Sequence, residues 1–152
     1  MNETIIQQVI AEHAPEVEFK QGNQFPEFTI SPVNLHQTAQ SLKTNESTLF
    51  DFLYCQTGVD LNGQLGVVYH LRSTKLKHAC VLKVFTGDRE NATLDTVCDI
   101  WPTAEFHERE IYDLMGIKFN NHPDLRRLFL EETFEGHPLR KDYNDDLNII
   151  QK

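Results

Sequence analysis

Two stretches in the first third of the chain place their apolar residues at helical spacing. The first follows Asn2, a residue that can cap a helix, and its apolar positions are Ile5, Ile6, Val9 and Ile10. The second begins at Ser31-Pro32, a capping residue followed by a proline that suits a first helical turn. Its apolar positions are Leu35, Ala39 and Leu42. These spacings predict two short amphipathic helices.

Other stretches alternate or concentrate apolar residues in the manner of strands. They cover residues 16–20, 27–31, 48–54, 65–71 and 79–85. A turn around Gly22 joins the first two stretches into a predicted hairpin. The third is expected to end near Gly58, and Asn62-Gly63 is a turn signal before the fourth. The pattern therefore predicts a mainly antiparallel sheet.

The last third of the chain changes character. Residues 93–100 predict a short helix that ends at Pro102, and Thr103 can cap a helix that runs to Met115, with Gly116 just after its end. Beyond Gly116 the periodicity fails. We therefore predict an α+β fold of two layers, with helices on one face of the sheet in residues 1–118 and an extended, irregular C-terminal arm in residues 119–152.

Length and composition agree with one globular unit. The chain has 152 residues, 39% of them hydrophobic, and a formal net charge of −9. This charge argues against a general binder of nucleic acid or lipid surfaces, because both reward positive charge. No apolar run has the length of a membrane span, and the first residues lack a signal pattern. Membrane association is therefore expected only through partners.

One local stretch reverses the overall charge. Residues 70–83 contain no acid but hold Arg72, Lys75, Lys77 and Lys83. Such a patch can contact phosphate or an acidic partner. A solvated hairpin whose lysines protect a sheet edge is the interpretation we favour.

The three cysteines, Cys55, Cys80 and Cys98, are far apart and form no CxxC pattern. This spacing argues against a zinc or iron–sulfur site and against a disulfide framework, so we interpret them as buried thiols.

The helix over residues 103–115 carries an unusual density of charge. On a helix, Phe106, Glu110 and Asp113 share one stripe with Arg109 beside it, while the opposite side is apolar. A helix between two neighbours would bury some carboxylates, which then need cationic partners. We expect Glu110 and Asp113 to form ion pairs with arginines of the arm. A solvated face is the alternative for these charges, and it is more open for Glu105 and Glu108 than for Glu110 and Asp113. Arg109 is spaced to pair with Asp113.

A metal site is the enzymatic alternative for the same region. His107, Glu110 and Asp113 follow one another at about one-turn spacing, and His122 and His137 lie nearby in the sequence. No HExxH pattern is present, and the proline-flanked histidines are more typical of turns that bind backbone. The chain also has no glycine-rich nucleotide loop and no recognisable nucleophile motif.

Several blocks of the last third resemble the thirty-kilodalton subunit family of NADH–quinone oxidoreductase, which is respiratory complex I. The blocks are Trp101-Pro102, residues 108–110, 112–114 and 116–117, His122-Pro123-Asp124-Leu125-Arg126-Arg127, and residues 136–143, which read GHPLRKDY. The resemblance marks as interface or family residues Glu108, Arg109, Glu110, Asp113, His122, Pro123, Asp124, Arg126, Arg127, Gly136, His137, Pro138, Arg140, Lys141 and Asp142.

The resemblance implies a subunit without catalytic residues or cofactors of its own. The complex would use FMN, iron–sulfur clusters, NADH and quinone. The partners would be the large subunit of the quinone site and the small subunit with the terminal cluster, and nucleic acid would not be a partner. The complex would place this subunit at the periphery of the cell inner membrane, on its cytoplasmic side. Arg126, Arg127 and Arg140 of the arm would fix orientation across the interface. A related assembly, such as an energy-converting membrane-bound hydrogenase or another quinone-reducing dehydrogenase, stays open.

Overall fold

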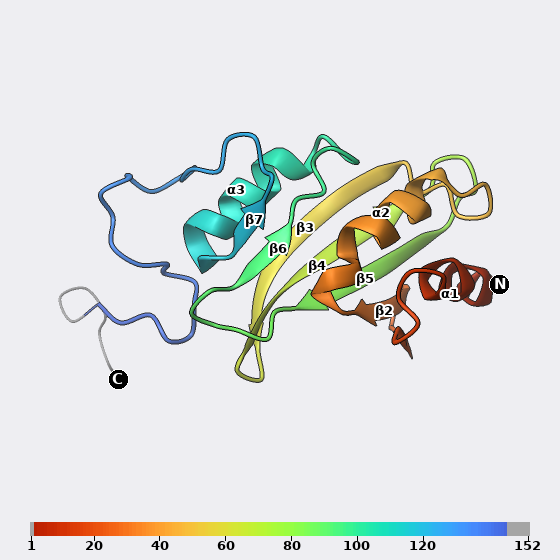
Figure 1. Cartoon of the computed structure of the whole chain (residues 1–152), viewed down its shortest axis with the longest axis horizontal. Helices are drawn as coiled ribbons and strands as arrows, with labels where there is room; N and C mark the ends of the chain where they lie inside the picture. Colours follow the sequence, from red (N-terminus) through yellow and green to blue (C-terminus); the bar gives the residue numbers. More distant parts are fainter. Residues whose placement is uncertain (1, 146–152) are drawn as a thin grey trace.

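A five-stranded sheet forms one layer of the computed structural model, which describes residues 2–145 (Figure 1). Its strands are β1 (Glu18–Gln21), β2 (Pro26–Ile30), β3 (Phe52–Leu61), β4 (Gln64–Arg72) and β5 (Ala79–Phe85). They lie in the order β1-β2-β5-β4-β3, and every neighbouring pair is antiparallel except β2 and β5. The predicted, mainly antiparallel sheet is confirmed.

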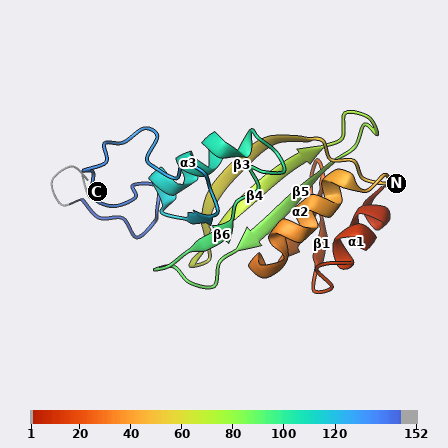
Figure 2. The same cartoon turned by 45° about the horizontal axis from the view of Figure 1, so that its top comes forward.

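The helices form the second layer on one face of this sheet (Figures 1 and 2). They are α1 (Glu3–Ala11), the 3-10 turn η1 (Pro32–Asn34), α2 (Leu35–Thr44) and α3 (Ala104–Met115). A small parallel sheet of β6 (Thr93–Asp95) and β7 (Lys118–Asn120) lies beside α3. The predicted α+β architecture is thus confirmed. No helix in the described range combines the length and apolar character that a membrane crossing requires.

Alternation along β4 explains how the two layers hold together. Leu65, Val67, Tyr69 and Leu71 are buried beneath the helices, whereas the intervening side chains face the other side of the sheet. The apolar faces of α1 and α2 complete this core. Each fully buried aliphatic or aromatic side chain contributes about 1.5–3 kcal/mol, so this core is the main source of stability.

Two expected elements are wrong, and long-range pairing explains both. Residues 93–100 do not form a helix: β6 takes Thr93–Asp95, and a turn follows. The chain after Gly116 is not wholly irregular, because β7 pairs in parallel with β6. Each strand is only three residues long, so neither shows a period that sequence reasoning can detect.

The third strand is longer and lies later than predicted. β3 starts at Phe52 and continues through Gly58 to Leu61. Gly58 does not end the strand, because it lies beneath α3. A Cβ atom there would come within 2.9 Å of Met115 Cγ and 3.0 Å of Ile111 Cγ2. The glycine therefore permits close packing of helix on strand.

The turn after β3 follows the predicted Asn-Gly chemistry. Asn62 and Gly63 both have positive φ, 52° and 77°, and Leu61 pairs directly with Gln64. The predicted cap at Asn2 is not formed, since its side-chain amide nitrogen lies 2.9 Å from His78 Nδ1 instead. Ile5 of the first predicted apolar stripe is exposed.

The basic stretch and the cysteines also depart from expectation. β4 and β5 are interior strands of the sheet, so the lysines of residues 70–83 do not protect an edge. Only Cys80 is fully buried, while Cys55 and Cys98 are partly exposed.

Residues 121–145 contain no helix or strand and form the described part of the arm. The arm returns to α3 and then extends beyond it, at the opposite end of the molecule from α1 (Figures 1 and 2). Residues 146–152 of the predicted arm lie outside the described residues. β7 crosses the predicted boundary at residue 118, and the division into two units stays a prediction.

Candidate functional site

Asp113 fastens the arm to α3. Its side chain is fully buried, and Oδ2 accepts three consecutive backbone N–H groups. They come from Leu128, Phe129 and Leu130 at 3.2, 2.7 and 3.1 Å. A single carboxylate oxygen therefore supplies the hydrogen bonds that a helix or strand would give this irregular segment.

Arg127 of the arm pairs with the same carboxylate and also binds the backbone of the arm. Its Nη1 donates to the Oδ1 atom and the carbonyl oxygen of Asp113, both at 3.0 Å. Its Nη2 donates to the carbonyls of Phe134 and Gly136 at 2.9 and 2.8 Å. The ion pair that we predicted between Asp113 and the arm is confirmed. Arg127 is almost buried within this chain, so its guanidinium is used internally.

The same contacts determine the charge state of Asp113. Burial would raise the pKa of this carboxyl, but hydrogen bonds from Phe129, Leu130, Arg127 and Leu128 outweigh it and lower the pKa below its usual range. His137 Nδ1 lies 2.9 Å from the carbonyl of Asp113. Asp113 is therefore an ionised structural anchor.

A second connection lies further along the arm. Buried Asp60, at the end of β3, accepts two hydrogen bonds from Arg89 at 2.7 and 2.8 Å and one from the backbone N–H of Lys141 at 2.9 Å. The Arg89 guanidinium holds the pKa of Asp60 far below its usual range. Arg140 donates to the Arg89 carbonyl and to Asp142. The GHPLRKDY block is thus attached to the sheet.

Glu108 is the third buried carboxylate. It accepts hydrogen bonds from Thr96 Oγ1 at 2.5 Å, Val97 N at 2.9 Å and Gln56 Nε2 at 3.4 Å. No cation pairs with it among residues 2–145, and burial raises its pKa. The solvated face that stayed open as an alternative for Glu108 does not apply, because its side chain is fully buried. It anchors the segment after β6, where we had predicted a helix.

Glu110 and Arg109 also differ from prediction. Glu110 is half-buried and forms no ion pair within the described range, so its predicted pairing with the arm is wrong. Arg109 does not pair with Asp113. Its Nε and Nη2 instead donate to the carbonyls of Arg126 and Arg127 at 3.3 and 3.1 Å. The side chain of Arg109 therefore binds the backbone of the arm.

The HPDLRR block forms a turn beside the helix start. His122 Nδ1 accepts the N–H of Asp124 at 3.0 Å, and His122 Nε2 lies 2.9 Å from the Glu105 carbonyl. Pro123 is exposed in this turn. Within residues 2–145, Arg126 pairs with Asp124 alone, and 59% of its side chain is exposed. The expected role of the two histidines in turns is confirmed.

The residues of the alternative metal site, His107, Glu110, Asp113, His122 and His137, do not come together as one ligand group among residues 2–145. The one group of at least three candidate ligands within residues 2–145 is Cys98, Glu108 and His122, with atoms within 4.8 Å of one another. Because His122 Nδ1 accepts a backbone N–H, the ring proton belongs on Nε2, which donates to Glu105. A metal about 2.0 Å from Nε2 would displace that carbonyl. The hydrogen bonds of His122 therefore fit a proton on Nε2 rather than a metal ion at that atom.

Sequence reasoning missed Asp60, Arg89 and Thr96. They lie outside the resembling blocks and far from their partners in the sequence, such as Lys141, which is 81 residues from Asp60. An acid at a strand end beside a turn gives no signal of burial.

Although these contacts hold the arm against α3 and β3, several large apolar side chains of this region remain exposed. Phe106 on α3 and Phe129 and Leu139 on the arm are 59%, 65% and 61% exposed. Gly136 and Pro138 lie in the turn formed by the GHPLRKDY block, where Gly136 has a φ of 89°. An arm that is held to the fold and presents apolar side chains is typical of a subunit that binds other chains. The fold and the arm are therefore those expected of an assembly subunit.

Comparison with known proteins identifies the family. The model of the family described as respiratory-chain NADH dehydrogenase, 30 Kd subunit, matches residues 28–147, and the chain belongs to that family. The resemblance found in the sequence is thereby confirmed.

Two curated relatives give the same result. The chain is 48% identical over 118 residues to the C/D subunit of NADH-quinone oxidoreductase from Phocaeicola vulgatus, covering 77% of this chain and 22% of that protein. It is 42% identical over 121 residues to the C subunit of the enzyme from Chloroherpeton thalassium, covering 78% of this chain and 50% of that protein. The chain thus spans between about a fifth and a half of these relatives.

A solved structure has the same fold. It is a chain of the membrane-bound sulfane sulfur reductase, an archaeal respiratory membrane complex. The TM-score is 0.76 at 28% identity, covering 93% of this chain and 85% of the other. The fold therefore also occurs in a respiratory complex with a different name.

Proposed function

We propose that this chain is a non-redox subunit of a NADH–quinone oxidoreductase, and that it joins the quinone-site subunit to the subunit with the terminal cluster. The observation that carries the proposal is the arm. Asp113 and Asp60 fix its backbone from within, and Phe129 and Leu139 remain exposed on it. An interface formed from a pre-ordered segment avoids much of the entropy cost of ordering it during association.

Names of relatives support the choice of partner. Several relatives carry the double name C/D, so one chain combines the equivalent of this domain, C, with a second unit, D. A covalent connection of this kind is consistent with two units that work side by side. The protein equivalent to that second unit is our proposed identity for the large quinone-site partner.

Cofactor chemistry is assigned to the partners. In this chain the buried carboxylates and the histidines of the arm already have hydrogen-bond partners. These are backbone groups, arginines and, for Glu108, also the side chains of Thr96 and Gln56. FMN, iron–sulfur clusters, NADH and quinone would belong to the rest of the complex. The proposed location is peripheral, on the cytoplasmic side of the cell inner membrane, held there by the other subunits.

The second candidate is the equivalent subunit of a related membrane complex with another electron donor or acceptor. The specific observation in its favour is the likeness to the sulfane sulfur reductase chain. The closer identities to NADH-quinone oxidoreductase subunits, 42–48%, favour the first candidate.

Affinity purification of the tagged chain from gently solubilised membranes tests the proposal. We expect the quinone-site and cluster-bearing subunits to co-purify with NADH–quinone activity. Hydrogenase-type or sulfur-reductase partners would favour the second candidate. A monomer without partners would refute both.

Two double variants test the arm within that experiment. Phe129→Ser with Leu139→Ser should reduce co-purification, because the exposed apolar side chains of an interface centre contribute most of the binding free energy. Ile5→Ser with Val33→Ser, which changes exposed apolar residues on α1 and η1, is the matched control. Equal recovery of partners by both variants would show that the arm is not the interface.

A further inference from the structure

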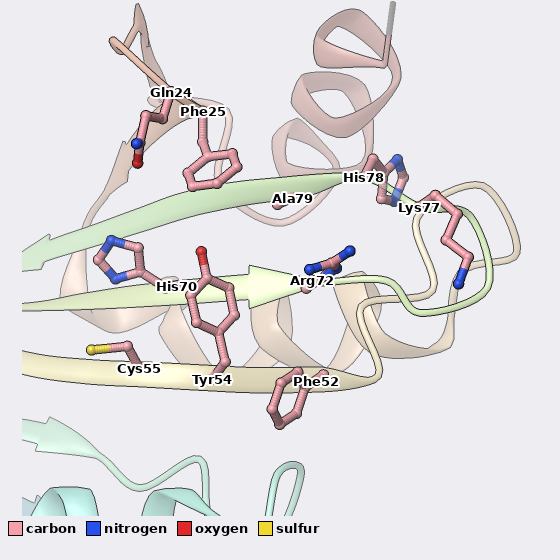
Figure 3. A pocket seen from close by; sticks show the side chains of 10 residues that line it. All are labelled: Gln24, Phe25, Phe52, Tyr54, Cys55, His70, Arg72, Lys77, His78 and Ala79. Carbon is pink, nitrogen blue, oxygen red and sulfur yellow. The ribbon is translucent and has the colours of Figure 1, made fainter.

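The face of the sheet opposite the helices carries a groove that the proposed function does not use. The groove has a volume of about 730 Å³ and crosses β5 and β4 between the loop before β2 and the strand β3 (Figure 3). The arm lies at the other end of the molecule (Figure 1). We call this feature the aromatic groove.

Rings form the two walls of the aromatic groove. Phe25 extends over the sheet from one side, while Phe52 and Tyr54 rise from β3 on the other (Figure 3). The centroids of Phe52 and Tyr54 are 6.0 Å apart, and those of Tyr54 and His70 are 5.6 Å apart. Phe52 and Tyr54 are 44% and 36% exposed. Clustered exposed rings on an uncovered sheet face mark a surface that another molecule covers.

The charges in the aromatic groove are positive and unpaired. Arg72 and Lys77 line it, and neither forms an ion pair with another of residues 2–145. No aspartate or glutamate of that range lines it. Two acids of the surrounding segments are occupied, since Asp51 accepts from Thr74 and Glu27 pairs with Lys83. A protein of net charge −9 thus keeps free cations at one place.

One lining side chain also lacks a hydrogen-bond partner. His70 Nδ1 is buried and has no hydrogen-bond partner among the residues that the structure describes. His78 differs, because its Nδ1 lies 2.9 Å from Asn2 Nδ2 and its Nε2 lies 2.6 Å from the Thr48 carbonyl. His78 therefore shapes the groove, whereas Arg72 and Lys77 have capacity for a ligand.

We propose that the aromatic groove binds one segment of a partner protein, in which acidic side chains alternate with aromatic or apolar ones. A carboxylate of that segment would bind Arg72 in bidentate fashion, and an apolar side chain would lie between Phe25 and Tyr54. A polyanion such as nucleic acid is disfavoured by the overall charge. A small molecule is disfavoured because its pocket would enclose it, whereas these walls stay open to water.

Binding of a short fluorescein-labelled peptide of alternating glutamate and phenylalanine tests the proposal on the full chain by fluorescence anisotropy. Arg72→Gln with Lys77→Asn should weaken binding about tenfold or more, because charge-assisted hydrogen bonds are lost. Asparagine suits position 77, where φ is 58°. The control, Lys20→Gln with Lys118→Gln, removes the same charge from exposed sites and should change affinity by less than about twofold.

Three comparison probes define the ligand class. Peptides of alternating glutamate and serine, or lysine and phenylalanine, should bind much more weakly, since each lacks one half of the chemistry. Pyrophosphate that bound as well as the peptide would make a small anion the occupant and overturn the proposal. Equal peptide binding by the two double variants would overturn it as well.

Photo-crosslinking in cells gives an independent test. With p-benzoylphenylalanine in place of Phe52, we expect cross-links to a stretch rich in aspartate or glutamate, and their loss in the variant with Arg72→Gln and Lys77→Asn. Cross-links to lipid or to non-acidic segments, or none, would refute the proposal. The arm variants Phe129→Ser and Leu139→Ser should not change binding of the peptide, so the proposed function and this inference fail separately.

Discussion

Replacement of Asp113 by asparagine should release the arm without unfolding the sheet. The carboxylate accepts three backbone N–H groups and the guanidinium of Arg127, all within 3.2 Å. Removing one partner of a buried ion pair costs about 3–5 kcal/mol. Asparagine retains one oxygen that can still accept, so we expect a loss near the lower end, about 3 kcal/mol. The open population of the arm then rises about a hundredfold.

Trypsin cleavage after Arg127 measures this opening. Arg127 is 11% exposed in the closed arm, so cleavage there requires release of the segment. When opening and closing are fast, the cleavage rate follows the open population. We expect Asp113→Asn to be cut about a hundredfold faster than the wild type. Amide exchange of Val67 and Tyr69 on β4 should stay unchanged, because these residues belong to the separate core.

Glu110→Gln provides the matched control on the same helix. It removes the same charge, but Glu110 forms no ion pair among residues 2–145, so its effect should be within about 0.5 kcal/mol. Equal cleavage of the two variants would show that general charge on α3, rather than the Asp113 connection, holds the arm. Cleavage of Asp113→Asn at the wild-type rate would refute the reasoning directly.

Three further perturbations have expected outcomes. Burial raises the pKa of Glu108 above its ordinary 4.5, so the folded state holds that proton more tightly than the unfolded state does. The free energy of unfolding should therefore fall as the pH rises from 4.5 through the raised pKa, and Glu108→Gln should remove this fall in urea denaturation. The same dependence of the free energy on pH in the variant would contradict this prediction. Asp60→Asn should accelerate amide exchange at Lys141, whose N–H it accepts, but not at residues 128–130; parallel acceleration would mean that the two connections are one. Gly116→Ala should cost about 1–2 kcal/mol in thermal denaturation, since φ is 74° and a Cβ would approach His137 Cδ2 to 2.6 Å; a neutral result would place His137 elsewhere.

Local sequence patterns were sufficient wherever local chemistry decides structure. The Asn62-Gly63 turn, the C-terminal end of α3 at Gly116 and the alternation of β4 all follow from neighbouring residues. The pairing of Asp113 with an arginine was also predictable, because a helix with two apolar sides must neutralise its buried charge. The family blocks identified the kind of protein for a related reason: their residues make the contacts that fasten the arm.

Which carboxylate is buried was decided by tertiary structure. Glu108 and Glu110 are two residues apart on α3. Sequence reasoning expected burial and pairing more strongly for Glu110, whereas Glu108 is the one that is fully buried. The environment of Glu108 depends on residues 96–97, which follow β6 and are placed by the pairing of β6 with β7. Helical periodicity gives the angle between two side chains but not the direction in which a neighbour lies.

The sequence by itself thus determined the fold class, the family and the presence of a charged, irregular arm. Tertiary structure decided how that arm is held, through Asp60 and Arg89 as well as Asp113, and which of its side chains remain exposed. It also gathered Phe25, Tyr54 and Arg72 from three separate segments into one groove. Contacts between segments far apart in the chain form because the shared core brings them together, and no period in the sequence records that proximity.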